Sequence, residues 1–289
     1  MAQRSQRSKR DRLLTILVCM GPFALFFFLF QILPILWVVV NSFNVEGSFS
    51  FDHYKDIFSS AFTLQAFKNS LWLSVVSSIL GLLISLILVN SLRRTDNRLR
   101  SLVISFINMS SNFSGVPLAF AFIIILGVNG AVTLLLQGLG IIDEFNLYSK
   151  WGLLAIYTYF QIPLGVLLLY PAFDALRDEW QEAAQLMGAT TWEFTRMVAL
   201  PILTPAIIGT FIILLANAMG AYASVYALTA GNYNVITVRI ASLVSGDMFL
   251  EPNLAAAISV VLMILMAFIV AINYLLLGRS RYAKYQANS

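Results

Sequence analysis

The sequence predicts an all-α membrane protein with six transmembrane helices, and three observations lead to this fold class. The 289 residues are 59% hydrophobic and only 11% charged, with a mean hydropathy of +0.82. A soluble globular domain carries roughly 25% charged residues, so this deficit indicates that a bilayer is the solvent. Six apolar stretches are long enough for the roughly 20 residues that a membrane-spanning helix needs. Charged residues avoid the middle of these stretches, where each would cost about 2.5–3.5 kcal/mol.

The first span is expected to be an uncleaved helix rather than a signal peptide. Its apolar stretch is longer than the roughly 7–15 residues of a signal h-region, and no small-residue cleavage site follows it. A further apolar stretch, 131–139, is too short to cross and is expected to be interfacial or re-entrant. The six predicted spans are 13–40, 69–92, 101–126, 150–175, 202–225 and 254–277.

Lysine and arginine are unequally divided between the two sides that these spans define. The basic tail 1–12, the connection 92–100, the segment 176–201 and the tail 278–289 hold 14 of the 18 basic residues. The other side holds Lys55, Lys68, Lys150 and Arg239. The positive-inside rule therefore predicts that both termini are cytoplasmic, as an even number of spans requires. The basic N-terminal tail is expected to set this topology and to contact lipid headgroups.

The sequence does not indicate metal or nucleic-acid chemistry. The chain has one cysteine, Cys19, inside an apolar run, and one histidine, His53. No Cys or His spacing resembles a zinc or iron–sulfur motif, so no metal site is predicted. The net charge of +4 comes from residues that flank the spans, and no nucleic-acid partner is expected.

The predicted cytoplasmic segment 174–201 has the pattern of two short helices separated by a glycine turn. After residue 176, apolar residues recur at the spacing of one helical face. Gly188 occupies the position where a helix C-terminus favours positive φ. Thr190 and Glu193 have capping-box spacing, which predicts the start of a second helix. That helix is expected to run to about Ala199 and to stop before Pro201, where the fifth span begins.

This segment also carries a family resemblance. Its pattern resembles the EAA loop of permease subunits of binding-protein-dependent ATP-binding-cassette (ABC) importers, with Val where the family usually has Ile. Two further segments, Phe51-x-x-Tyr54 and Asn69-Ser70-Leu71, are similar to the same family. The resemblance covers roughly 66–277, after a first span and extracytoplasmic loop at 13–65. The matching loop residues are Glu182, Ala183, Ala184, Gly188, Val198, Leu200 and Pro201.

The resemblance implies a type I ABC importer permease fold in a bacterial cytoplasmic membrane, and a translocation subunit rather than an enzyme. The EAA loop would dock on a separate ATPase dimer that carries ATP and Mg²⁺, with Trp180 and Trp192 packed against the permease body. This chain contains no phosphate-cradling G-x-x-x-x-G-K-[ST] motif, so no cofactor is expected on it. A second permease subunit, identical or homologous, and an extracytoplasmic solute-binding protein would complete the importer. The chain looks most like the spermidine/putrescine branch, with iron, thiamine or phosphonate as alternative solutes.

Polar residues in the third and fifth predicted spans are candidates for the solute path. Such residues face the bundle interior or a water-filled cavity, although interhelical hydrogen bonding explains them equally well. The polar cluster before Pro117 can also mark a broken helix. A secondary transporter would need a titratable group within the bilayer, and an embedded enzyme would need a catalytic cluster; the sequence favours neither. The candidate path residues are Ser111, Asn112, Asn217 and Tyr222.

Overall fold

The computed structural model describes residues 20–93, 95–142, 145–245 and 250–286, with side chains up to residue 272. The basic tail 1–12 and the side chains of the tail 278–289 therefore lie outside the described residues. The chain divides into two compact units, one made of Met1–Ser60 and Ile240–Met263, the other of Ala61–Arg239 and Ile264–Ser289.

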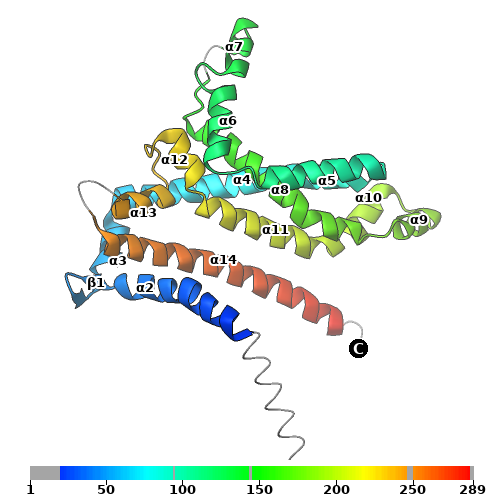
Figure 1. The fold of residues 1–289 in the computed structure, drawn as a ribbon. Coiled ribbons are helices and arrows are strands. Elements are labelled where there is room, and N and C mark those ends of the chain that lie inside the picture. Colours follow the sequence, from blue (N-terminus) through cyan, green and yellow to red (C-terminus); the bar gives the residue numbers. More distant parts are fainter. Residues whose placement is uncertain (1–19, 94, 143–144, 246–249, 287–289) are drawn as a thin grey trace, which may run out of the picture. The chain divides into compact units, whose positions relative to one another are not determined.

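The smaller unit contains a long helix followed by a hairpin and a short helix (Figure 1). The hairpin turn at Glu46 and Gly47 has φ values of 49° and 85°, the pattern of a type I′ turn that suits two-residue hairpins. Its elements are the π-helical turn η1 (Phe28–Ile32), α2 (Leu33–Asn41), β1 (Asn44–Val45), β2 (Ser48–Phe49) and α3 (Asp52–Ser59).

The Phe51-x-x-Tyr54 segment of this unit forms an aromatic cluster with the hairpin. The ring of Phe43 lies 5.1 Å from that of Phe49 and 5.2 Å from those of Phe51 and Tyr54, measured between centroids. The hydroxyl of Tyr54 shares a 2.7 Å hydrogen bond with that of buried Ser42. The segment therefore fastens α3 to the end of α2.

The larger unit is built around α8, which packs along α4 and also contacts α5 and α11 (Figure 1). Its helices are α4 (Ala61–Arg93), α5 (Asn97–Ser111), α6 (Val116–Leu126), α7 (Ala131–Gly138), α8 (Lys150–Asp174), α9 (Asp178–Leu186), α10 (Thr191–Phe194), η2 (Thr195–Ala199), α11 (Leu200–Gly220) and α12 (Ala223–Thr229). Two helices, α13 (Ile236–Ser245) and α14 (Pro252–Gln286), belong partly to each unit.

Small residues let α4 and α8 approach closely. A Cβ added at Gly81 would lie 2.7 Å from the Cβ of Gln161, and one added at Gly165 would lie 2.4 Å from the hydroxyl of Ser85. The buried Gln161 amide donates to the hydroxyls of Ser78 (2.8 Å) and Ser77 (3.3 Å). Close backbone approach and side-chain hydrogen bonds are what hold helices together where the hydrophobic effect between them is weak.

The Asn69-Ser70 pair fastens the loop before α13 to α4. The Asn69 amide donates to the carbonyl of Asn234 (2.9 Å), and the Asn234 amide donates to the carbonyl of Phe62 (2.8 Å). The hydroxyl of Ser70 accepts from the backbone N–H of Ile236 (2.8 Å). The bonds to Asn234 and Ile236 satisfy backbone groups that have no partner within a helix.

Within the described residues, six helices are long and apolar enough to cross a membrane, as predicted, but the bounds of three differ clearly. The helix of the span predicted at 69–92 begins earlier, at Ala61. The predicted span 101–126 is wrong, because α5 ends at Ser111 and the apolar helix begins at Val116. The short stretch 131–139 forms α7, which continues this third candidate. The predicted span 202–225 is also wrong, because its helix runs from Thr191 to Gly220. The candidates are Met20–Asn41, Ala61–Arg93, Val116–Gly138, Lys150–Asp174, Thr191–Gly220 and Pro252–Ile272.

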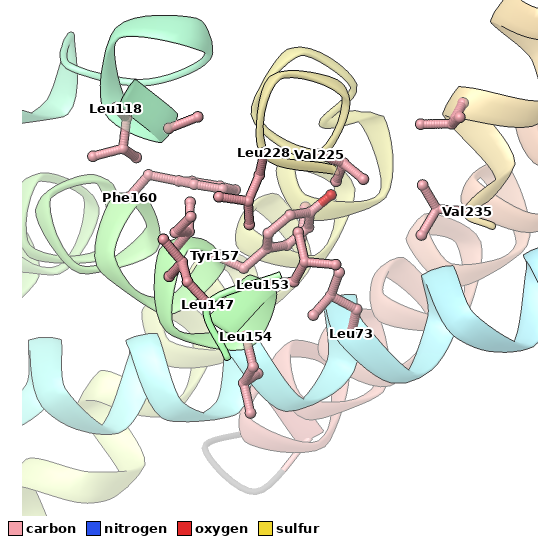
Figure 2. Packing of buried hydrophobic residues seen from close by; sticks show 14 residues of the cluster. Leu73, Leu118, Leu147, Leu153, Leu154, Tyr157, Phe160, Val225, Leu228 and Val235 are labelled. Carbon is pink, nitrogen blue, oxygen red and sulfur yellow. The ribbon is translucent and has the colours of Figure 1, made fainter. Parts of the chain in front are cut away.

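A buried apolar cluster joins α4, α6, α8 and α12. Figure 2 shows Tyr157 and Phe160 of α8 among Leu118 of α6 and Val225 and Leu228 of α12. A second cluster lies at the other end of α8, where Phe173 and Leu176 meet residues of α4, α5 and the segment 174–201. Each cluster supports one candidate functional site.

Candidate functional site

The first candidate site is the segment 174–201, where α9 and α10 meet at Gly188, as predicted. Gly188 has φ +88° and lies just beyond the last turn of α9. Its N–H donates to the carbonyl of Gln185 (2.9 Å), and the N–H of Ala189 donates to that of Ala184 (3.0 Å). This pair of bonds is the Schellman motif, which ends a helix where a residue can adopt positive φ.

The predicted capping box opens α10. The backbone N–H of Thr190 donates to Oε2 of Glu193 (2.7 Å), and the N–H of Glu193 donates to Oγ1 of Thr190 (3.2 Å). Each side chain thus satisfies a backbone donor that the first helical turn leaves free. The loop geometry is therefore encoded by residues that are neighbours in the sequence.

The expected stop before Pro201 is wrong, because the helix continues through a π-helical turn. In η2 the N–H of Leu200 donates to the carbonyl of Thr195, five residues earlier. A proline lacks an N–H and its ring crowds the carbonyl four residues before it. A π turn changes the hydrogen-bond register at this point. Pro201 then stands in the first turn of α11, so α10, η2 and α11 form one continuous helical stretch.

One face of the segment is anchored to the larger unit. Ala184 of α9 and Phe194 of α10 are buried in the second apolar cluster with Phe173 and Leu176. At the end of α4, the guanidinium of Arg93 donates to the carbonyl of Leu176 (2.8 Å) and forms an ion pair with Asp178. The segment therefore lies at the same end of the unit as the connection between α4 and α5.

The opposite face of the segment is exposed and partly apolar. Leu186, the last residue of α9, and Met187, which follows it, are 90% and 83% exposed. Trp192 is 70% exposed, so the expectation that it packs against the rest of the chain is wrong; Trp180 is partly covered. Of the predicted loop residues, Ala184 is buried and Val198 half-buried, and the others are exposed: Glu182, Ala183, Gly188, Leu200 and Pro201.

The second candidate site is a cavity of about 540 Å³ where two helical stretches are interrupted. The first interruption is 112–115, between α5 and α6, where Gly115 has φ +71°. The second is 221–222, between α11 and α12. Three predicted path residues, Ser111, Asn217 and Tyr222, line the cavity. Asn112 does not; its amide donates to the carbonyl of Asn108 (3.0 Å).

Three hydroxyl groups hold these interruptions in place. The hydroxyl of Ser224 donates to the carbonyl of Gly115 (3.3 Å), which ties the second interruption to the first. The hydroxyls of Tyr157 (3.0 Å) and Thr237 (3.2 Å) both donate to the carbonyl of Ala221. Sequence reasoning missed Tyr157 and Thr237. A tyrosine within an apolar span was the available signal, because a buried Tyr hydroxyl needs a partner.

The cavity offers uncharged polar groups beside an aromatic ring. Its remaining polar lining comes from Ser114 and Ser224 and from backbone, while Phe160 supplies the ring. All the residues that line this cavity in the described part of the chain are uncharged. The cavity is therefore suited to hydrogen bonding with a polar solute rather than to acid–base chemistry.

Comparisons with known proteins identify the family and similar transport proteins. Residues 77–281 match the family model described as "Binding-protein-dependent transport system inner membrane component". The spermidine/putrescine transport system permease protein PotB of Haemophilus influenzae is 25% identical over 256 residues, covering 85% of this chain and 88% of that protein.

Two solved structures share the fold. A chain of a bacterial ABC transporter for import of the acidic polysaccharide alginate has a TM-score of 0.78 at 20% identity, covering 96% of this chain and 99% of that one. A chain of the alginate transporter in complex with its pentasaccharide-bound periplasmic protein has a TM-score of 0.75 at 20% identity, covering 93% and 94%.

Proposed function

Because the chain belongs to the family of binding-protein-dependent transport system inner membrane components, we propose that it forms half of a solute path and couples that path to a separate ATPase through the segment 174–201. It is a multi-pass ABC importer permease with six apolar helices of spanning length. The coupling role goes beyond this family assignment. The observation that supports it best is the exposed helix–glycine–helix segment.

The segment combines a fixed backbone with an uncovered apolar surface. Its inner face is anchored by Ala184 and Phe194, while Leu186, Met187 and Trp192 project outward. Exposed apolar patches with polar rims mark interaction sites. Fully burying one such side chain contributes roughly 1.5–3 kcal/mol, so covering these three would favour docking.

The charge of the segment indicates the chemistry of its partner. Residues 174–201 contain five acidic and two basic residues. Glu182 and Glu179 are exposed on α9, beside the apolar residues. The docking surface of the ATPase subunit is therefore expected to be an apolar groove with basic residues at its rim. ATP and Mg²⁺ would be bound by that subunit, and this chain would bind neither.

The distribution of basic residues supports a cytoplasmic position for the segment. The ion pair of Arg93 with Asp178 brings the basic connection after α4 and the segment 174–201 to one end of the larger unit. Fourteen of the 18 basic residues were assigned to this side from the sequence, together with both termini. We therefore place the segment, and both termini, in the cytoplasm.

The cavity at the two interruptions is proposed as this chain's part of the solute path. Asn217, Ser111 and Tyr222 line it, and the interrupted helices expose backbone there, as in other transporters that bind solutes at discontinuous helices. A second permease subunit, identical or homologous, would supply the opposite wall. An extracytoplasmic binding protein would deliver the solute, as the relative in complex with its periplasmic protein suggests.

The solute is proposed to be a small polar molecule, with a polyamine as the first candidate and iron, thiamine or phosphonate as alternatives. PotB, which is 25% identical to this chain, is a permease protein of a spermidine/putrescine transport system. The ligand that co-purifies with the partner binding protein would identify the solute directly.

Co-purification with the ATPase tests the coupling role. The chain alone should neither hydrolyse ATP nor bind nucleotide, whereas the complex should hydrolyse ATP in response to the loaded binding protein.

A Leu186→Asp, Met187→Asp double variant should lose the ATPase during purification, because it places charge on the apolar docking face. A control variant, Phe58→Asp on α3, places the same charge on an exposed apolar side chain outside the candidate spans and away from the segment. Retention of the ATPase by the loop variant would contradict the proposal.

A further inference from the structure

A lysine lies between two tryptophans where α4 passes the first turn of α8. The Nζ atom of Lys150 is 5.1 Å from the ring centroid of Trp151 and 5.7 Å from that of Trp72. The two rings meet edge to face at 5.9 Å. Both lysine distances fall within the roughly 6 Å range of cation–π attraction. Trp72 and Trp151 are 36% and 59% exposed, so this Trp–Lys cluster lies at the surface of the larger unit.

Helix lengths place the cluster at one boundary of the bilayer. At 1.5 Å per residue, the distance along α4 from Trp72 to Arg93 is about 32 Å. The distance along α8 from Lys150 to Asp174 is about 36 Å. The hydrocarbon core is about 30 Å thick. Arg93 and Asp174 therefore mark one boundary and the Trp–Lys cluster marks the other, at the depth where tryptophan is enriched in membrane proteins.

The positive charge of the cluster is not balanced by an anion within the described residues. The ion pairs found there join Lys55 to Asp52 and Arg93 to Asp178, and neither includes Lys150. The helix dipole gives Lys150 no compensation, because cations are stabilised at C-termini and this lysine begins α8. Lys68, one helical turn before Trp72 and also exposed, adds a second positive charge to the same face of α4.

From Trp72 toward its C-terminal end, α4 carries a row of apolar residues on one face. Val76, Ile79 and Leu83 follow Trp72 at helical spacing on the same face, and Ile79 and Leu83 are exposed. The surface thus combines a cationic, aromatic head region at the interface with an apolar stripe that runs toward the middle of the bilayer. A phospholipid has the matching two parts, a charged headgroup and apolar acyl chains.

We propose that the Trp–Lys cluster is a binding site for an anionic phospholipid in the leaflet that faces the first turn of α8. The lipid phosphate contacts the ammonium group of Lys150, which has three donors and no acceptor. One acyl chain lies along Ile79 and Leu83. The site rests on the geometry of α4 and α8 alone and does not depend on the ATPase coupling or on the orientation proposed above.

Native mass spectrometry of the full chain tests the site. The delipidated chain in detergent is given equal amounts of palmitoyl-oleoyl phosphatidylglycerol and phosphatidylcholine, and the bound lipids are counted. The wild type should retain phosphatidylglycerol preferentially. Lys150→Gln should lower that retention about fivefold, the effect of one basic residue near an anionic lipid, and leave phosphatidylcholine unchanged. Lys150→Arg should restore the preference, which also shows that the site still folds.

The control is Lys55→Gln, which removes another exposed lysine, one paired with Asp52 in the smaller unit, and should not alter lipid retention. An excess of inorganic phosphate should fail to displace phosphatidylglycerol, since a soluble anion lacks the acyl chain. Displacement by phosphate would overturn the lipid assignment in favour of a soluble-anion site. Wild-type phosphatidylglycerol retention by Lys150→Gln would also overturn the proposal. So would loss of the lipid when the chain pairs with a second permease, which would show that a protein covers the cluster.

Discussion

Substituting Gly188 tests whether the turn between α9 and α10 carries the coupling. Gly188 has φ +88°, and a Cβ built there meets nothing within 4 Å. The cost of a side chain is therefore conformational, because no neighbour obstructs it. A β-branched residue held in this region costs about 1–3 kcal/mol. Relieving that strain would require breaking the hydrogen bonds of Gly188 to Gln185 and of Ala189 to Ala184.

The expected effect is graded by residue type. A strain of about 2 kcal/mol shifts the equilibrium between the observed turn and a relaxed one by roughly 30-fold. Gly188→Val should therefore abolish coupling. Gly188→Ala should have an intermediate effect, since a left-handed conformation costs an ordinary residue about 1–2 kcal/mol. Gly188→Asn should stay close to wild type, because asparagine adopts this conformation more readily. Glu182→Ala should impair coupling mildly, because it removes an exposed acceptor and leaves α9 intact.

The measurement is solute-stimulated ATP hydrolysis by the assembled complex, together with ATPase co-purification and the melting temperature of the permease in detergent. Gly209→Val is the matched control, because Gly209 lies within α11, has no positive φ and has open space at its Cβ. All variants should melt close to wild type, since none alters the buried clusters. Equal stimulation in the Gly188→Val and Gly188→Asn variants would refute the reasoning, because strain would then have no bearing on coupling.

Three further predictions concern packing, the cavity and topology. Gly81→Ala should lower the melting temperature, with an overpacking cost of about 1–3 kcal/mol, because its Cβ would lie 2.7 Å from that of Gln161. Gly209→Ala, where a Cβ meets open space, should not lower the melting temperature. Equal melting temperatures for the two variants would contradict the close approach of α4 and α8. Tyr157→Phe should lower the free energy of unfolding by only about 1 kcal/mol, because Thr237 still donates to the carbonyl of Ala221. Adding Thr237→Val should lower it further, as measured by chemical unfolding. An introduced cysteine at Ser48 should react with an impermeant thiol reagent in intact cells, whereas one at Asn97 should not; labelling of Asn97 would invert the proposed orientation.

The turn in the segment 174–201 was predictable from the sequence because the residues that determine it are close together in the chain. The positive φ of Gly188 and the reciprocal bonds of Thr190 and Glu193 involve residues within five positions of each other. No distant contact is needed to choose between this turn and another. The same local reasoning failed for Trp192. Residues two positions apart on a helix point about 200° from each other. Since Phe194 faces inward, Trp192 must face outward.

The interruptions at the cavity were less predictable because their stability comes from distant residues. Breaking a span leaves backbone carbonyls without helical partners, which is costly unless other groups satisfy them. At Ala221 those groups are Tyr157, 64 positions away, and Thr237, 16 positions away. Nothing near Ala221 in the sequence identifies them. The polar cluster around Gly115 indicated that a break was possible, but not that it would face the break at Ala221.

A continuous helix joins the two candidate sites. The stretch from α10 through η2 into α11 begins at Thr191, in the exposed segment, and ends at Gly220, in the cavity lining. Its length of about 45 Å exceeds the thickness of the hydrocarbon core. Because the backbone is unbroken, a tilt imposed on α10 by docking moves Asn217 and Gly220 directly. The proposed coupling would therefore need no relay of side chains between the exposed segment and the cavity.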